Sequence, residues 1–448
     1  MPGESMLTVQ RESALGDSLF HRIADARQYS DSLFEIVRPE ALYDRPIPER
    51  HRIVFYIGHL EAFDWNLLHE NVFGLGSFHP EFDRLFAFGI DPVGGGLPTD
   101  QPSDWPSLDS VREYVRGIRT LLDEKLADAT SAEIYQRDGF SLETLLNVAI
   151  EHRLMHVETL AYMLHQLPLE RKRPQIVSLP VLSSAITHSM VEVPAGFAHL
   201  GLSQGSGVFG WDNEFQAQTI DVPEFAIDRC MVTNGEFLAF TEDEGYQRRE
   251  LWSDLDWDWK SVGGISHPVF WTTRNRSWAY RTMLDEVPLP LEWPVYVSHA
   301  EASAYARWVG KALPTEAQWQ RAAYGSADNT ERFYPWGDST PDPAHGNFDL
   351  QSWDPMPVNA HPRGASAFGA EGMLGNGWEW TSTVFGPFPG FEPFAFYRGY
   401  SADFFDGKHY VIKGGSARTA ACMLRPSFRN WFQSHYQYVY AGFRCVSH

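Results

Sequence analysis

Cysteine is scarce in this sequence. Its three cysteines, Cys230, Cys422 and Cys445, are widely spaced and form no CxxC pair. A disulfide framework or a thiolate zinc site is therefore not expected. Positive charge is also limited, because 36 Lys and Arg stand against 58 Asp and Glu and give a formal net charge of −22. A phosphate backbone needs a basic surface, so this balance argues against broad binding to nucleic acid or to an anionic membrane.

Long apolar runs are missing as well. No stretch approaches 18 consecutive apolar residues, so we expect no membrane span, and the first residues lack the apolar centre of a secretory signal. With 21% charged and 14% aromatic residues the composition is that of a globular protein. The sequence predicts a cytoplasmic protein.

The chain of 448 residues is too long for one ordinary core and changes character along its length. Residues 1–167 carry apolar side chains at three- and four-residue spacing in four long segments, which predicts a four-helix bundle. Residues 168–190 are rich in proline and charge and are interpreted as a linker. Residues 191–448 are rich in Gly, Pro and Trp, with short helices and strands, and indicate an irregular α+β domain.

The last helical segment, "EHRLMHVETLAYMLHQLP" (151–168), carries two histidines one turn apart in an apolar context. On a helical wheel His152 and His156 fall on the same stripe as Leu145 and Leu160, the stripe expected to face inward. The same helical wheel, applied to the second predicted helix, places His59 on the face that points into the bundle. Buried imidazoles must be satisfied by some partner, and neutral imidazole is the commonest metal ligand.

Two interpretations of these histidines remain open from the residues alone. They are either hydrogen-bonded core residues or the ligands of one metal ion. Three imidazoles without a thiolate suit Zn, Fe or Cu.

Longer stretches resemble known families. "IGHLEAFDWNLL" and "EHRLMHVETLAYMLHQLP" resemble the metal-binding segments of a DinB-type four-helix bundle. "PVYVSHAEASAYARWVGKALPTEAQWQRAAYG", "GMLGNGWEWTST", "RPSFRNWF" and "YAGFRCV" resemble the formylglycine-generating-enzyme (sulfatase-modifying factor) domain, whose fold is C-type-lectin-like. The two domains in this order resemble the ergothioneine-biosynthesis sulfoxide synthases and the N-terminal part of the ovothiol synthases.

The resemblance implies a non-heme iron(II) enzyme that uses O2 to join a sulfur to the imidazole of hercynine (Nα-trimethylhistidine). His59, His152 and His156 are then the iron ligands. The residues implied around the two substrates are Met155, Asn430, Trp431, Phe432, Gln433 and, as a carboxylate clamp, Arg84. The candidate catalytic tyrosines are Tyr397 and Tyr400.

Several departures from the family pattern leave the donor open. Met155 stands where the ergothioneine enzymes usually carry Gln, and "FQSHYQY" after Trp431 lacks the charges that hold γ-glutamylcysteine in one subgroup. We therefore expect a cysteine-like thiol donor, with a selenoneine synthase that joins a selenosugar to hercynine as the alternative.

Two further classes compete with this prediction. A formylglycine-generating enzyme needs a close cysteine pair for copper, which the spacing of the cysteines does not supply. A non-catalytic binding module of the C-type-lectin-like kind would have no need of three inward histidines.

Overall fold

The computed structural model describes residues 3–87, 97–128, 141–174, 186 and 188–447, with side chains from residue 19 onward. The chain forms two compact units, Met1–Gln175 and Ile176–His448. Much of the predicted linker, residues 175–185 and 187, lies outside the described residues. No helix in the described ranges is both long and apolar enough to cross a membrane.

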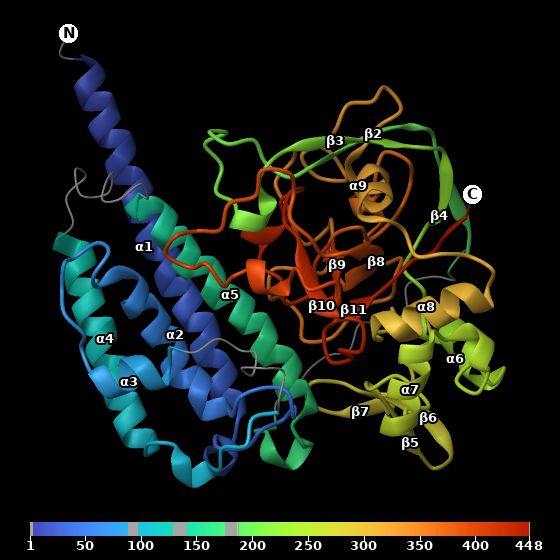
Figure 1. Ribbon diagram of the computed structural model, residues 1–448, viewed down its shortest axis with the longest axis horizontal. Helices are drawn as coiled ribbons and strands as arrows, with labels where there is room; N and C mark the ends of the chain where they lie inside the picture. Colours follow the sequence, from blue (N-terminus) through green and yellow to red (C-terminus); the bar gives the residue numbers. More distant parts are fainter. Residues whose placement is uncertain (1–2, 88–96, 129–140, 175–185, 187, 448) are drawn as a thin grey trace. The chain divides into compact units, whose positions relative to one another are not determined.

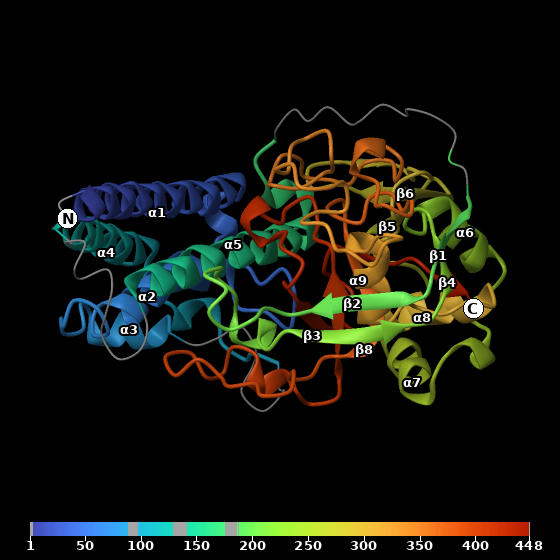
Figure 2. The same cartoon turned by 90° about the horizontal axis from the view of Figure 1, so that it is seen from above.

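The first unit is the expected helical bundle (Figures 1 and 2). Its α-helices are α1 (Gly3–Ile36), α2 (Ile53–Leu68), α3 (Pro80–Leu85), α4 (Leu108–Asp128) and α5 (Leu142–Gln166). The helix α1 packs along α5, and α2 contacts both α4 and α5. The four long helices correspond to the four predicted segments, whereas the short α3 was not predicted.

Local signals define where these helices begin. Ser141 caps α5 by accepting a hydrogen bond from the backbone nitrogen of Thr144, and Ser107 does the same for Ser110 at the start of α4. The helix α4 is amphipathic and buries a single stripe of apolar side chains. That stripe consists of Val111, Tyr114, Ile118, Leu122 and Leu126.

The helix α5 differs from the single inward stripe that the helical wheel suggested. It is buried almost all round, because α1 and α2 both pack against it. Even Glu151, Arg153 and Glu158 are buried. The helix is therefore central to the bundle, and its charged side chains must find partners inside it.

A buried ionic cluster meets this requirement for Arg153. Its guanidinium donates to Glu61 Oε1 (3.0 Å), to Asp64 Oδ2 (2.6 Å) and to the Leu60 carbonyl (3.0 Å), all on α2. Arg119 of α4 also pairs with Glu61. Burial alone would raise the pKa of Glu61, but Arg153 and Arg119 hold it at about 2. The cluster ties α5 and α4 to α2.

The second unit contains small sheets joined by irregular loops (Figure 1). Its strands are β1 (Met190–Val193), β2 (Gly196–Leu200), β3 (Gln218–Val222), β4 (Phe225–Asp228), β5 (Trp271–Arg274), β6 (Ser277–Arg281), β7 (Glu286–Pro288), β8 (Trp378–Val384), β9 (His409–Lys413), β10 (Asn430–Gln433), β11 (Ala441–Gly442) and β12 (Val446–Ser447). Its α-helices are α6 (Asn234–Glu242), α7 (Asp254–Gly263), α8 (His299–Trp308) and α9 (Glu316–Tyr324).

The strands pair in the orders β1-β4-β12, β10-β9-β8-β11, β2-β3 and β5-β6-β7. All pairs are antiparallel except β11 with β8. The helices predicted from "HAEASAYARWVG" and "TEAQWQRAAYG" are α8 and α9, and the strands predicted from "HYVIKGGS" and "YVYAGFRCV" are β9, β11 and β12. The predicted α+β character of this half is therefore confirmed.

The core of the second unit lies where α9 packs against β2, β3, β8 and β9. Trp319 of α9 is fully buried and donates through Nε1 to Glu379 of β8 (2.9 Å). Arg444 pairs with the same carboxylate at 2.6 Å, so the buried charge is balanced. This core fixes β8 and β9, and β9 in turn supports β10.

Candidate metal centre

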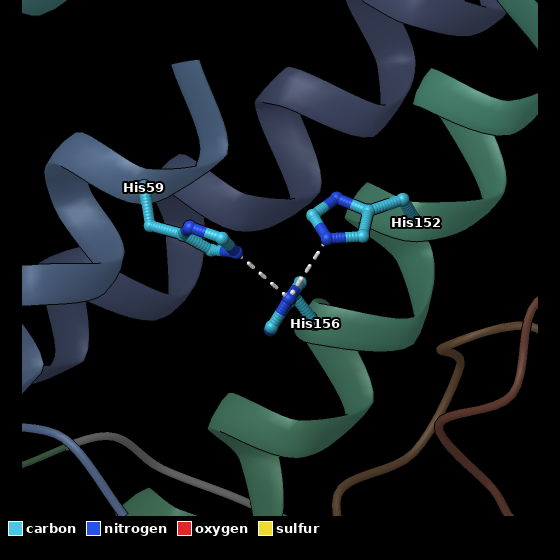
Figure 3. A group of neighbouring side chains, drawn as sticks. All are labelled: His59, His152 and His156. Carbon is cyan, nitrogen blue, oxygen red and sulfur yellow. Dashed lines mark hydrogen bonds between the residues drawn. The ribbon is translucent and has the colours of Figure 1, made fainter. Parts of the chain in front are cut away.

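Three histidines converge inside the helical unit (Figure 3). His59 comes from α2, and His152 and His156 come from successive turns of α5. The Nε2 atom of His156 lies 3.2 Å from Nε2 of His59 and 3.1 Å from Nε2 of His152. One ligand nitrogen from each ring lies within 4.8 Å of the other two. The structure thus brings together the three residues predicted as metal ligands.

These separations fit one shared ion. Two nitrogens that each bind one metal ion at about 2.1 Å, with an angle of about 90° at the metal, would lie about 3.0 Å apart. The Nε2–Nε2 distances of 3.2 Å and 3.1 Å are close to this value. Neutral imidazole nitrogens suit Fe, Zn or Cu, and three protein ligands leave further positions for small molecules. The donor set therefore fits a catalytic metal ion.

All three imidazoles are held in the neutral form. Burial lowers the pKa of His59 to about 4, although its hydrogen bond to Phe86 acts in the opposite direction. Burial is also the main cause that lowers the pKa values of His152 and His156 well below the ordinary value. Each ring keeps a lone pair at neutral pH, as a metal ligand must.

A main-chain carbonyl determines which nitrogen of His59 carries the proton. Nδ1 of His59 lies 2.7 Å from the carbonyl oxygen of Phe86, and both residues are buried. A carbonyl can only accept, so Nδ1 must donate. Nε2, which faces His156, is left with its lone pair.

Aromatic rings stack on two of the histidines. The Phe63 ring lies 3.4 Å from that of His152 at an interplanar angle of 12°, and the Phe55 ring lies 4.8 Å from that of His59 at 18°. Such stacking limits rotation of the imidazoles and surrounds them with apolar surface.

Strand β10 carries the four residues predicted to hold substrate in the second unit. Its side chains alternate, so Asn430 and Phe432 share one face while Trp431 and Gln433 share the other. Trp431 stacks on Phe385 with a ring separation of 4.2 Å. The four residues therefore lie on two faces of the strand.

The structure brings one predicted catalytic tyrosine close to Trp431. The ring of Tyr400 lies 5.5 Å from that of Trp431 and stacks on Trp211 at 4.0 Å. Tyr397 lies 5.6 Å from Tyr400. Tyr400 is 8% exposed, so its ring is anchored in an aromatic cluster.

The two remaining predicted residues belong to the helical unit. Arg84 of α3 donates through Nε to the Pro80 carbonyl at 3.0 Å and lines an open pocket of about 550 Å³ with Trp105 and Phe82. Met155 immediately precedes His156 on α5 and is partly exposed.

Sequence reasoning missed Phe86 and Gly58 at the metal centre. Phe86 contributes a main-chain atom, which no residue type can reveal. Gly58 offered a signal, because glycine is unusual inside a helix and here directly precedes a histidine that is a predicted ligand.

Comparison with known families divides the chain in the same way. Residues 181–448 match the sulfatase-modifying factor enzyme 1-like domain. Residues 22–160 match the DinB superfamily.

Individual relatives span both regions. The chain is 40% identical over 340 residues to a Mycobacterium tuberculosis protein named hercynine oxygenase, covering 75% of this chain and 76% of that protein. It is 34% identical over 442 residues to a Mycolicibacterium smegmatis protein of the same name, covering 96% and 98%. Ergothioneine biosynthesis protein 1 of Neurospora crassa is 28% identical over 495 residues, covering 92% of this chain and 55% of that protein.

Proposed function

This chain belongs to the family of the hercynine oxygenases and to the sulfatase-modifying factor enzyme 1-like family, and from that membership we propose its reaction. The protein is proposed to be an oxidative enzyme that acts on hercynine in ergothioneine-type biosynthesis. It joins a cysteine-like thiol to the imidazole ring with O2 as the oxidant and iron(II) as the cofactor, giving a sulfoxide.

The observation that carries this proposal is the convergence of three buried, neutral imidazoles. His59, His152 and His156 would hold the iron. Bound iron(II) supplies the one-electron chemistry with O2 that protein side chains lack. Three ligands leave room for O2 and for a soft sulfur atom.

The protein's own contribution at this centre is orientation and exclusion of water. The rings of Phe55 and Phe63 lie against His59 and His152. The three imidazoles are no more than 4% exposed. A dry site strengthens electrostatic interactions and suppresses side reactions of a reactive oxidant.

Residues of β10 are proposed to hold the acceptor, and Met155 of α5 remains a predicted substrate residue. An aromatic face attracts a quaternary ammonium group, which suits Trp431 or Phe432 to the trimethylammonium of hercynine. Asn430 can bond its carboxylate. Tyr400, with Tyr397 beside it, is proposed as the proton donor, because a phenol is the acidic group that this aromatic cluster offers.

A reconstitution experiment tests the function. The purified protein is loaded with iron(II) without oxygen and then given O2, hercynine and a panel of cysteine, γ-glutamylcysteine and a selenosugar. Mass spectrometry identifies the product. A hercynine–cysteine sulfoxide supports the proposal, and a carbon–selenium product formed instead supports the selenoneine alternative. If no donor is coupled although iron binds stoichiometrically, the proposed reaction is wrong.

A further inference from the structure

We propose that Gly58 and Phe86 are positioning residues for His59. In this arrangement the Phe86 ring packs on the helix surface that Gly58 leaves bare. Its main-chain carbonyl thereby holds the His59 proton on Nδ1 and directs the Nε2 lone pair toward His152 and His156. The role in metal binding rests on the proposed function, whereas the proton position is a property of the metal-free protein.

The first support is the hydrogen bond itself. His59 Nδ1 lies 2.7 Å from the Phe86 oxygen, and the two residues are 1% and 0% exposed. In a buried site no water can replace this acceptor without opening the core. A hydrogen bond to the second nitrogen commonly fixes the tautomer and orientation of a ligand histidine.

The second support is Gly58, which is adjacent to the ligand. A Cβ atom at Gly58 would lie 2.6 Å from Cδ1, Cδ2 and Cε1 of Phe86. Real Cβ atoms essentially never make contacts that short, so a larger residue at position 58 would displace the ring. Glycine inside a helix destabilises the helix relative to alanine. Its presence at position 58 is explained because the Phe86 ring occupies the space that a side chain would need.

The third support is that the Phe86 ring cannot easily move away. It lies 5.7 Å from the ring of Phe82, 5.9 Å from Tyr114 and 6.2 Å from Trp105. Trp105 is itself fixed, because its Nε1 donates to Asp100 at 2.8 Å. Displacement of the ring by a methyl group must therefore shift the Phe86 backbone, and with it the carbonyl that holds His59.

A comparison glycine exists in the same unit. A Cβ atom at Gly117 of α4 would lie 2.4 Å from Cζ of Phe78. Phe78 is 41% exposed and its ring can swing into solvent. Gly117→Ala thus introduces the same methyl group against a phenylalanine, in a helix that carries no metal ligand.

The test begins with the metal-free full-length protein labelled with ¹⁵N-histidine at pH 7.5, with His59 assigned through a His59→Gln variant. Long-range ¹H–¹⁵N spectra are expected to show His59 protonated on Nδ1. A proton on Nε2 would overturn the proposal. This measurement involves no metal, so it stands even if the proposed reaction fails.

The second measurement is the affinity for iron(II), titrated without oxygen. Gly58→Ala should abolish the Nδ1–H signal and weaken binding by about 10–100-fold, the usual effect of losing a group that orients a ligand. Gly117→Ala should change the affinity less than twofold. In a Phe86→Ala background, Gly58→Ala should have little further effect, because the clashing ring is gone.

Three results contradict the positioning role. Gly58→Ala could keep both the Nδ1–H tautomer and the affinity of the unmodified protein. Gly117→Ala could weaken binding as strongly as Gly58→Ala. The losses of iron(II) affinity caused by Gly58→Ala and by Phe86→Ala could multiply in the double variant. Any one of them would show that the glycine serves packing alone.

Discussion

The Nε2 atoms of His59 and His156 lie 3.2 Å apart, although the two residues are separated by 97 positions in the chain. Because Nδ1 of His59 donates to Phe86, its Nε2 can only accept. A proton on Nε2 of His156 could serve either His59 or His152, which lies 3.1 Å away. A divalent cation at this point would engage the lone pairs of all three rings at once.

Replacement of one ligand should therefore remove the metal and leave the fold intact. His152→Ala is expected to lose stoichiometric iron and turnover, because two imidazoles rarely hold a catalytic ion. Metal analysis after anaerobic loading and unfolding curves provide the measurement. The control is His69→Ala, since His69 caps α2 and contacts the Leu75 carbonyl, outside the cluster. Normal iron content and turnover in His152→Ala would disprove the ligand assignment.

The sequence predicted the inward positions of the three histidines because helical periodicity is a local property, whereas their role as metal ligands was implied by the family resemblance. Residues 152 and 156 must share a face of any helix, and the apolar neighbours of His59 turned it inward. The two-domain division followed equally from the change in composition. Phe86 could not be predicted, because its carbonyl acts on a residue 27 positions away through tertiary packing. The separation of Trp431 from Asn430 and Phe432 could have been predicted had 430–433 been recognised as a strand.

Removal of Arg153 should destabilise the helical unit. Its loss leaves the carboxylates of Glu61 and Asp64 buried beside each other. Breaking a buried ion pair from one side costs about 3–5 kcal/mol. Arg153→Met is expected to lower the free energy of unfolding of this unit by about that amount in urea titrations followed by circular dichroism.

The control for Arg153 is an exposed pair in the same unit. Arg171 lies 3.7 Å from Asp44, and the two side chains are 44% and 37% exposed. Arg171→Met should cost less than about 1 kcal/mol. Equal losses in the two variants would mean that the buried cluster has no special role.

Asp212 should make the second unit less stable as pH rises. Burial raises the pKa of this carboxyl to about 6, although the hydrogen bond from Ser401 lowers it. Between about pH 4 and 6 the folded state therefore binds more protons than the unfolded state, so stability falls with increasing pH. A shift of about two pKa units corresponds to about 3 kcal/mol.

Asp212→Asn removes this titration. The variant should be more stable than the unmodified protein at pH 8 by up to about 3 kcal/mol, and the difference should vanish near pH 4. Ser401→Ala should extend the loss of stability to higher pH and increase its total size, because it removes a bond that favours the charged form. Urea unfolding followed by tryptophan fluorescence measures both, and a pH-independent effect of Asp212→Asn would contradict the assignment.

Replacement of Trp431 should affect the binding of hercynine and of the donor differently. If its face holds the trimethylammonium group, Trp431→Ala raises the Michaelis constant for hercynine more than that for the donor. Trp431→Phe keeps an aromatic face and should retain most of the affinity. Because Trp431 also stacks on Phe385, a purely structural role would affect both substrates equally, and that outcome would assign it to the scaffold.

The donor should be small or uncharged. A γ-glutamyl group brings an extra carboxylate and ammonium, and a buried site must pair such charges. The five residues that follow Trp431, from Phe432 to Tyr436, offer no permanent charge. His435 is already bound to Asp256, with Nε2 2.8 Å from Oδ1, and stacks on Trp259 at 4.6 Å.

Arg84 is the candidate clamp that remains, and one arginine pairs only one carboxylate. In competition assays, cysteine or a selenosugar is therefore expected to be consumed at least about ten times faster than γ-glutamylcysteine, a difference of about 1.4 kcal/mol in transition-state binding. Arg84→Gln should raise the Michaelis constant for cysteine and leave that for an uncharged selenosugar unchanged. Faster consumption of γ-glutamylcysteine would mean that charges elsewhere in the chain complete the site.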